Sequence, residues 1–456
     1  MIKPVIATVI VSLISVEMYA QTSYFTFGKK RMDRGKLIHY ASPTSIFIAG
    51  ESEDEITGEK AIFLSNLTNE GKTNWTKTYS GSISYAINDW VVLPGGGFVV
   101  SAEQYYKKDR ETLYLMRLDN TGNMLWSNLF NEGGNEVEGL SIAATQDGGF
   151  IVTGLIKQAS IISDVFFSMR KEKEYVYVLK IDSKGNKQWS KKFNYEQNAV
   201  AKGYKVVETI DGYVIGGSIE EKPDVKGAEI LILKITKKGD FMWAKTLGGT
   251  KGEYIKNMLV VDNDLFVIGA TTSFGVSGVE AYCMRLTTSG NLKWFKTYGG
   301  DKNENLSTIR KIDERTLVLA GETTSFGKGS YDALFLTTTY DGDILTAETF
   351  GNDKIESLGS AIISGNRMYA TGFSYASSTP KSTQAYMLIS PLLNKNETHF
   401  VKANATKTQV HTAEIVVKEL TKNLLTNVIP VTERVAPPVL KTVIKSETME
   451  TESFIK

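Results

Sequence analysis

The stretch Gly239–Trp243 reads Gly-Asp-Phe-Met-Trp, and the stretch Gly290–Trp294 reads Gly-Asn-Leu-Lys-Trp. Both are copies of one motif, Gly-x-x-x-Trp, that recurs about every 52 residues, with a sixth copy in which Thr346 replaces the ring. The tryptophans of the motif are Trp75, Trp126, Trp189, Trp243 and Trp294. A repeat of this length built from strand-like segments is typical of propellers and solenoids, so the repeat decides the fold.

Each repeat contains four short segments rich in β-branched and aromatic residues, separated by Gly, Asp or Asn. In one copy the predicted strands are 254–261, 265–270, 281–286 and 292–298. A small residue closes the second strand of every copy: Gly50, Ala102, Gly154, Gly217, Gly269, Gly321 and Gly372. These seven positions predict an all-β fold, a seven-bladed β-propeller of four-stranded antiparallel blades. A glycine there suits either a crowded site near a central axis or a local β-bulge.

The predicted third strand occurs seven times, but the fourth strand follows only six of these copies. The missing strand resembles the N-terminal stretch 24–28, which reads Tyr-Phe-Thr-Phe-Gly, like the end of the stretch 294–299. We expect this N-terminal strand to complete the last blade, because pairing the two ends of the chain removes open sheet edges. The alternative places 24–28 in the first blade and closes the ring by side-chain packing. The tryptophans are predicted to lie on outer strands and to pack between neighbouring blades, as structural residues.

The first 20 residues predict a secretory signal peptide, with Lys3, the apolar run Val5–Ile14 and Ala20 before a polar stretch. A buried first strand is the alternative reading of this run. We expect a signal peptide at 1–20, the propeller at 21–392 and an extended or partly helical C-terminal tail at 393–456. The expected location is outside the cytoplasm of a bacterial cell: the periplasm, the outer surface or the medium. Cys283 is the only cysteine, so no internal disulfide is possible, and we expect it to be buried.

The chain offers few residues for chemistry. Its 52 basic and 51 acidic residues create no net field that would attract nucleic acid or an anionic membrane, and no later stretch has the length of a bilayer span. Only three histidines occur, His39, His399 and His411, which argues against a catalytic triad or a histidine-rich zinc site. We therefore predict no catalytic, cofactor-binding or metal-binding residue, and no cofactor.

Four glutamates recur ten residues after the tryptophan position: Glu136, Glu253, Glu304 and Glu356. A ring of carboxylates could bind cations or a sugar. Repetition in successive blades favours a local structural role instead, such as accepting backbone N–H groups after the Gly-Gly turn.

An insertion of about eleven residues within 155–173 distinguishes one repeat from the others. Loops that differ on one rim of a rigid scaffold are the natural place for recognition. Phe166, Phe167, Met169 and Arg170 are therefore the predicted partner-binding residues. A hydrophobic extension of the blade itself is the alternative.

The tail abandons the repeat at about residue 395 for Lys, Thr, Glu and Val. The segment 413–428 has the spacing of an amphipathic helix through Val416, Leu420 and Leu424, while 435–438 and the polar end favour extended or disordered chain.

The run Leu118–Trp126 resembles the tryptophan-docking motif of quinoprotein-like β-propellers. The stretches 243–249, 268–278 and 294–300 look like the propeller repeats with Asp-Gly-Gly and Ser-Phe-Gly found in secreted bacterial and archaeal proteins. This resemblance covers residues 22–392 and implies a fold rather than an activity. Related quinoprotein dehydrogenases have eight blades, a calcium-bound quinone cofactor and often adjacent cysteines. Seven repeats and one cysteine depart from that pattern, so the cofactor is not carried over.

These observations predict an exported, non-catalytic propeller that acts as a protein-interaction scaffold. Its expected partners are other envelope or cell-surface proteins, bound in part through the tail, with a glycan as a further possibility. The alternative is a polysaccharide-binding or polysaccharide-cleaving propeller. A quinone-dependent oxidoreductase is a third and weaker hypothesis.

Overall fold

The computed structural model describes most of the repeat region and five short pieces of the tail. The described residues are 23–27, 32–53, 57–81, 83–106, 110–164, 167–194, 200–220, 227–275, 278–351, 355–375, 383–392, 409–412, 416–419, 425–428, 441–444 and 452–453. For residues 27, 106, 110, 159–164, 167–172 and 194 and for the tail pieces, only the backbone is described. The predicted signal peptide lies outside the described residues. None of the described residues belongs to a helix with the length and apolar character of a membrane span.

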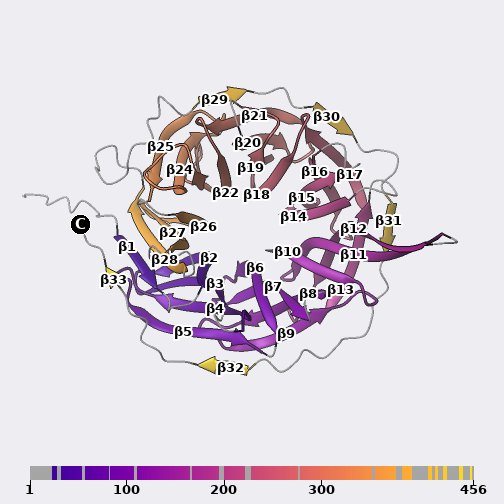
Figure 1. Cartoon of the computed structure of the whole chain (residues 1–456), viewed down its shortest axis with the longest axis horizontal. Helices are drawn as coiled ribbons and strands as arrows, with labels where there is room; N and C mark the ends of the chain where they lie inside the picture. The colour runs from indigo at the N-terminus through magenta and orange to yellow at the C-terminus, as the bar shows by residue number, and fades with distance from the viewer. Residues whose placement is uncertain are drawn as a thin grey trace, which may run out of the picture.

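The repeat region consists of four-stranded antiparallel units that follow one another along the chain and surround a common axis (Figure 1). The first three units comprise β2 (Met32–Ser42), β3 (Ser45–Glu53), β4 (Lys60–Leu67), β5 (Thr73–Ser80); β6 (Ser84–Val92), β7 (Phe98–Tyr106), β8 (Arg110–Leu118), β9 (Met124–Phe130); and β10 (Glu136–Ala144), β11 (Phe150–Asp164), β12 (Phe167–Ile181), β13 (Lys187–Asn194). The next three comprise β14 (Val200–Thr209), β15 (Gly212–Glu220), β16 (Glu229–Thr236), β17 (Phe241–Gly248); β18 (Glu253–Val261), β19 (Asp264–Thr271), β20 (Glu280–Thr287), β21 (Leu292–Gly299); and β22 (Glu304–Lys311), β23 (Thr316–Thr323), β24 (Asp332–Thr339), β25 (Ile344–Phe350). The last unit comprises β26 (Glu356–Ser364), β27 (Arg367–Tyr375), β28 (Thr383–Pro391) and the N-terminal strand β1 (Ser23–Phe27).

The architecture is therefore all-β and propeller-like. Hydrogen bonding among the described residues groups the strands into six sheets, one of them of nine strands, because a parallel bridge from Val137 to Thr112 joins two units. No single sheet closes on itself, so the sheet count alone does not establish the predicted number of blades.

The N-terminal strand β1 pairs antiparallel with β28, with Phe25 opposite Met387. This is the pairing expected from the likeness of 24–28 to 294–299, and the alternative that placed this segment in the first unit is wrong. The two ends of the repeat region thus share one sheet.

The Gly-x-x-x-Trp motif has a direct structural explanation. Gly290 has a φ of 85°, which favours glycine, in the turn that leads into the outer strand β21. A Cβ atom on Gly290 would also lie 2.7 Å from the ring of Trp243 in the preceding unit. The same contact joins four further pairs: Trp75 with Gly122, Trp126 with Gly185, Trp189 with Gly239 and Trp294 with Gly342. Each tryptophan is half-buried and lies against the motif glycine of the next unit. At Gly71 the corresponding ring belongs to Phe25.

The recurrent small residue of the second strand lies opposite a β-bulge of the first strand. Gly269 pairs with Ile255, immediately before the register shift in β18. A Cβ atom there would lie 1.8 Å from the Tyr254 carbonyl oxygen, so glycine allows the two backbones to approach closely. Both readings of this glycine, a bulge and a crowded backbone, hold at once.

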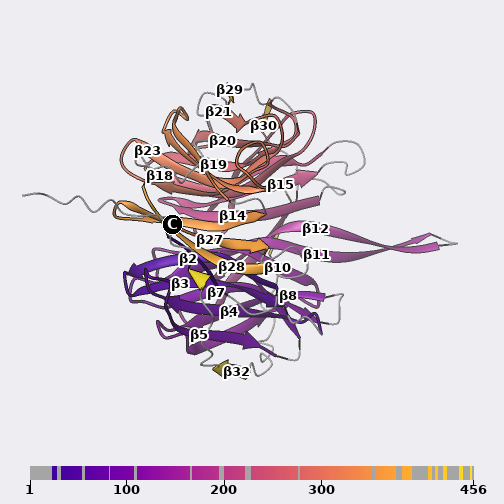
Figure 2. The same cartoon turned by 60° about the vertical axis from the view of Figure 1, so that its left-hand side comes forward.

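The insertion in the third unit lengthens β11 and β12 into an antiparallel hairpin that projects away from the rest of the ring (Figure 2). Its register continues to the tip, where Asp164 is opposite Phe167. The inserted segment thus extends two strands of the sheet.

The described residues of the tail form five short strands: β29 (Gln409–Thr412), β30 (Val416–Glu419), β31 (Leu425–Val428), β32 (Lys441–Ile444) and β33 (Glu452–Ser453). The amphipathic helix considered for 413–428 is wrong, since β30 and β31 lie within that range. β-branched residues such as Val416 and Val417 suit a strand, and an outer strand supplies the hydrogen-bonding partner that an isolated segment lacks.

Candidate functional site

Every first strand lies closest to the axis and carries a β-bulge at the same place in the repeat. The register of each of these strands shifts by one residue just after the position opposite the small residue of the second strand. The residues left out of the pairing are Lys36, Asn88, Leu140, Tyr204, Lys256, Ser307 and Gly359. A bulge releases one residue from the ladder and re-aims its side chain.

All of these bulge residues line one cavity of about 500 Å³ on the axis. The volume is in the range of small-molecule sites. Whereas the glycine and tryptophan of the motif repeat almost unchanged, the bulge residue differs between most units. A constant frame therefore presents a varied set of side chains to one central space.

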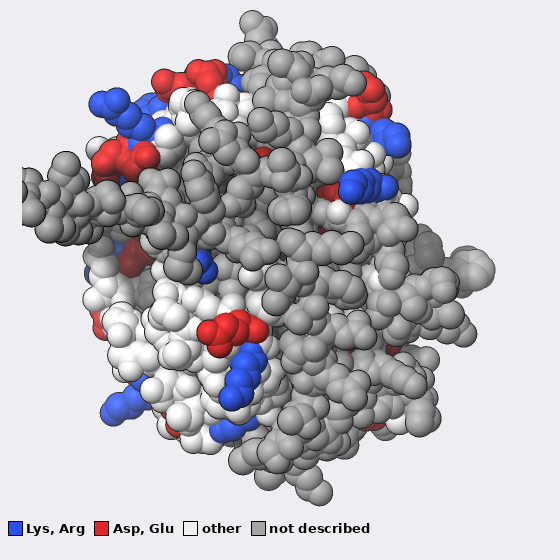
Figure 3. Space-filling view, turned by 90° about the vertical axis from the view of Figure 1, so that its left-hand side faces the viewer, with Lys and Arg blue, Asp and Glu red and all other residues white. Residues whose placement is uncertain are grey.

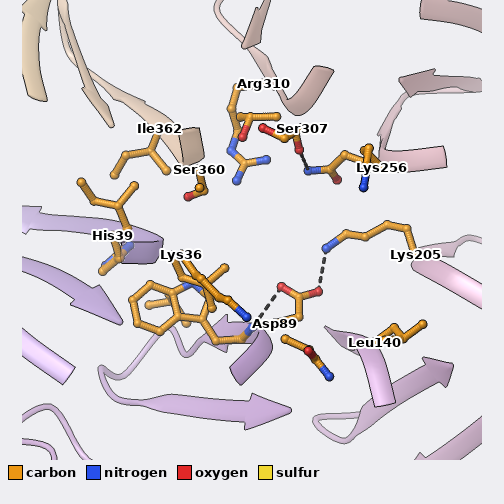
Figure 4. A pocket seen from close by; sticks show the side chains of 18 of the residues that line it. Lys36, His39, Asp89, Leu140, Lys205, Lys256, Ser307, Arg310, Ser360 and Ile362 are labelled. Carbon is orange, nitrogen blue, oxygen red and sulfur yellow. Dashed lines mark hydrogen bonds and ion pairs between the residues drawn. The ribbon is translucent and has the colours of Figure 1, made fainter. Parts of the chain in front are cut away.

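Four cations and one carboxylate lie in the wall of this cavity: Lys36, Lys205, Lys256, Arg310 and Asp89 (Figure 4). The Asp89 carboxylate accepts hydrogen bonds from Lys205 Nζ at 2.7 Å and from Ser141 Oγ at 2.8 Å. Lys36 donates to the Ile87 carbonyl oxygen at 3.0 Å and forms an ion pair with Glu51. Two of the four cations are thus compensated.

Lys256 and Arg310 form no ion pair with a described carboxylate. The Arg310 guanidinium donates to its neighbouring backbone carbonyl, that of Ile309, at 2.9 Å. Burial lowers the pKa of Arg310 and the negative charge of Asp89 opposes this shift, so the arginine remains charged at neutral pH. These two cations are the groups in the wall best able to meet an anion.

The wall also contains aromatic and aliphatic side chains, among them His39, Trp90 and Ile362. The Trp90 ring stacks on Phe98 with 4.7 Å between centroids, which fixes its orientation. Burial lowers the pKa of His39, so its imidazole is neutral at pH 7 and able to accept a proton. The cavity wall thus combines cationic side chains with flat apolar ones.

The recurrent glutamates do not lie in this cavity. Glu253 and Glu304 are buried, and their carboxylates accept backbone N–H groups of the Gly-Gly turns, from Gly249 at 3.2 Å and from Gly300 at 3.0 Å. Burial raises the pKa of Glu253. The structural role favoured for these residues matches their contacts.

Three of the predicted partner-binding residues, Phe167, Met169 and Arg170, belong to strand β12 of the projecting hairpin and not to the bulged first strands whose residues line the cavity. Phe166 lies outside the described residues, and for Phe167, Met169 and Arg170 only the backbone of β12 is described. Their role stays a prediction. Cys283 is buried in β20, and burial raises the pKa of its thiol.

In the part of the chain that the structure describes, no three His, Cys, Asp or Glu side chains gather in the manner of a metal site. The cavity residues were missed because none belongs to a catalytic motif. The available signal was positional: the same place in the first strand, just before the middle of that strand, holds different residues in most copies.

Comparisons with known proteins give structural neighbours only. No family model matches the chain, and no curated protein matches it. Among solved structures, it is similar to a tryptophan-to-alanine mutant of Synechocystis apocarotenoid oxygenase (10% identity, TM-score 0.43, covering 78% of this chain and 88% of that one). A chimera of that oxygenase with RPE65 gives 10% identity and a TM-score of 0.42 over 76% of this chain and 88% of that one. β-1,2-Mannobiose phosphorylase from Listeria innocua gives 10% identity and a TM-score of 0.29 over 68% and 91%.

These neighbours are named as enzymes, which contradicts the prediction of a non-catalytic protein-interaction scaffold. We therefore set that prediction aside. At this identity and these TM-scores, the likeness transfers no activity, substrate or cofactor to this chain.

Proposed function

We propose that this protein binds a small organic anion with an apolar body in the cavity on its axis. The observation that carries the proposal is the convergence of all the bulge residues on that cavity, where four cations meet one carboxylate, Asp89.

The charge of the wall decides the class of ligand. An anionic group of the ligand would pair with Lys256, which is exposed beside the cavity, and with the half-buried Arg310. On the described part of the face in Figure 3, acidic and basic side chains are interspersed. The outer surface seen there therefore offers no comparable concentration of cations.

The apolar side chains of the wall indicate the chemical character of the uncharged part of the ligand. Trp90, Ile362 and the neutral His39 favour a flat or hydrophobic group over a bare inorganic ion. Tyr204, Asn257 and Ser307 supply polar groups that would fix its orientation. A carboxylate or phosphate attached to an aromatic or aliphatic group suits both the cationic and the apolar side chains of the wall.

Isothermal titration calorimetry with 2-naphthoate and with its uncharged analogue 2-naphthamide tests this proposal. The acid should bind and the amide should bind at least about tenfold more weakly, as expected for a charge-assisted contact. Arg310→Ala and Lys256→Ala should each weaken naphthoate binding by about 10- to 100-fold. Arg315→Ala and Lys251→Ala, exposed cations of the same units, are the matched controls. Equal binding of acid and amide, or an equal loss in the controls, would exclude an anion site in this cavity.

We further propose that the units form a seven-bladed propeller, with β1 as the outer strand of the last blade. The seven repeats in the sequence, the seven bulged first strands and the β1–β28 pairing support this count. We also propose that the chain is exported after removal of residues 1–20, as the charged and apolar pattern of this segment suggests. N-terminal sequencing of the protein recovered from cells tests the cleavage: a mature chain that retains Met1 would contradict it.

A further inference from the structure

The described tail strands lie around the repeat region, and each adds a fifth strand to one unit. β29 pairs antiparallel with β21, β30 with β17, β31 with β13, β32 with β5 and β33 with β1. The tail thus passes the units in the reverse of their order in the chain and ends on the sheet from which it departs (Figure 1). Among the described residues, the outer strands β9 and β25 pair with no tail strand.

Four of the five described tail strands share one register. The four longer tail strands each pair with the four residues that begin two positions after the motif tryptophan: 77–80, 191–194, 245–248 and 296–299. The first residue of each acceptor segment is a lysine: Lys77, Lys191, Lys245 and Lys296. At the same place in the two strands without a tail strand stand Asn128 and Glu348. Acceptor and non-acceptor strands therefore differ at a defined position.

At least three of these lysines are tied to the next unit. Lys77 donates to Asn123 at 2.7 Å, Lys191 to Asp240 at 2.8 Å and Lys296 to Asp343 at 2.7 Å. Such a contact holds the outer strand against the neighbouring unit. Asn128 of β9 makes one as well, donating to the Gly185 carbonyl oxygen at 2.9 Å, so the charge of the lysine is what distinguishes the acceptor segments. Fixed, unpaired edge strands are the surfaces to which extended segments add by main-chain hydrogen bonding.

The short length of the tail strands indicates that each of them binds weakly. The backbone hydrogen bonds of four residues are comparable in free energy to the conformational entropy lost on fixing those residues. The strands therefore depend on being linked in one chain, which raises the effective concentration of each for its acceptor. Loss of one tail strand should leave its neighbours in place.

From this pattern we infer that the outer strands form a repeated strand-accepting surface, and that the C-terminal tail of this chain is its displaceable occupant. The tail is not a fifth strand built into each unit. It is a separable ligand of the outer strands and binds them one strand at a time. The common register and the lysine of the acceptor segment determine where each tail strand binds. This inference is independent of the ligand proposed for the central cavity.

Hydrogen–deuterium exchange on the full chain supplies an internal comparison. Outward-facing amides in 191–194, 245–248 and 296–299 should exchange about tenfold or more slowly than those at the equivalent places in β9 and β25. Equal exchange in all outer strands would overturn the inference.

Proline substitutions test whether the tail strands act separately. Val417→Pro with Lys418→Pro removes two consecutive backbone donors from β30, so one of them faces β17 whichever way the strand is turned. Protection should fall in 245–248 and persist in 296–299. Ala403→Pro with Asn404→Pro, outside the described strands, should change neither segment. Collapse of protection in every unit would show an inseparable part of the fold and would contradict the inference, as would no loss at all.

Cleavage tests separability directly. A protease site inserted after Asn396 allows the tail to be cut from the folded full-length protein. The fragment should co-elute with the repeat region in size-exclusion chromatography at micromolar concentration and separate after dilution. The variant Lys191→Glu, which introduces the charge found at Glu348, should increase exchange in 192–194 without affecting 246–248. Immediate release of the fragment at micromolar concentration, or retention that survives every dilution and denaturant up to global unfolding, would each overturn the proposal.

Discussion

The outer and inner strands of each unit use their residues in opposite ways. On the outer strand the same tryptophan recurs against the same glycine of the next unit, as in Trp243 and Gly290. On the inner strand the bulge recurs but its residue changes, from Lys256 in one unit to Ser307 in the next. The constant pairs hold neighbouring units together, and the changing residues set the chemistry of the cavity. In this chain, repetition marks the frame and variation marks the candidate site.

The largest expected effect is on stability, and it belongs to the outer strand. Trp243→Ala should lower the free energy of unfolding by about 3 kcal/mol, because a half-buried indole leaves the interface between two units. Tyr204→Ala, at the bulge of the same unit, should cost less than half as much while weakening binding of the naphthoate probe. Chemical denaturation and calorimetry of the two variants measure this contrast. Similar losses of stability in both would abolish the distinction between frame and site.

The next effect concerns the glycine under the ring. Gly290→Ala should destabilise by about 1–2 kcal/mol, because alanine is strained at the φ of 85° and its Cβ would lie 2.7 Å from the Trp243 ring. In the double variant with Trp243→Ala the steric part disappears, so the two costs should not add. A double-mutant cycle by urea denaturation measures the coupling. If the destabilisation of the double variant equals the sum of the two single effects, the contact with the Trp243 ring is not the reason that glycine occupies position 290.

The smallest expected effect is a change in pH dependence at a buried carboxyl group on an inner strand. Glu138 lies beside the bulge of β10, where burial, followed by the hydrogen bond with Glu111, raises its pKa to about 8 despite an ion pair with Lys157 at 2.7 Å. In the unfolded chain the pKa of a glutamate is near 4.3, so the folded protein binds this proton more tightly than the unfolded chain does. The protonated Glu138 therefore stabilises the fold fully below about pH 4, and this stabilisation is lost as the pH rises towards 8.

Glu138→Gln should therefore flatten the fall in melting temperature between pH 5 and 8, measured by differential scanning fluorimetry. Glu314→Gln, on an exposed turn, is the control and should leave the slope unchanged. An unchanged slope in the Glu138 variant would mean that this carboxyl is ionised throughout the range.

The repeat allowed the fold class to be predicted well, and the function poorly. The spacing of Trp243 and Trp294 gave the strand order within a unit and the pairing of β1 with β28, since both depend on local pattern and on the absence of a fourth strand after β28. The bulge residues were not identified, because one unpaired residue in a strand alters neither hydrophobic periodicity nor turn chemistry. The tail strands were missed for a different reason. Four residues carry too little periodicity to be recognised, and their partners lie far away in the chain.

The pairing of β1 between β28 and β33 brings the first and last described segments of the chain into one sheet. The spatial arrangement of the strands therefore does not require the chain to begin at β1. A circularly permuted chain, opened at the exposed turn near Asp313 and joined through a linker between its original ends, would retain every strand pairing of the repeat region. The cut would separate β22 from β23, so that β23 becomes the first strand of the new chain and β22 its last. The unit that combines strands from the two ends of the chain would then be β22–β25 instead of β26–β28 with β1.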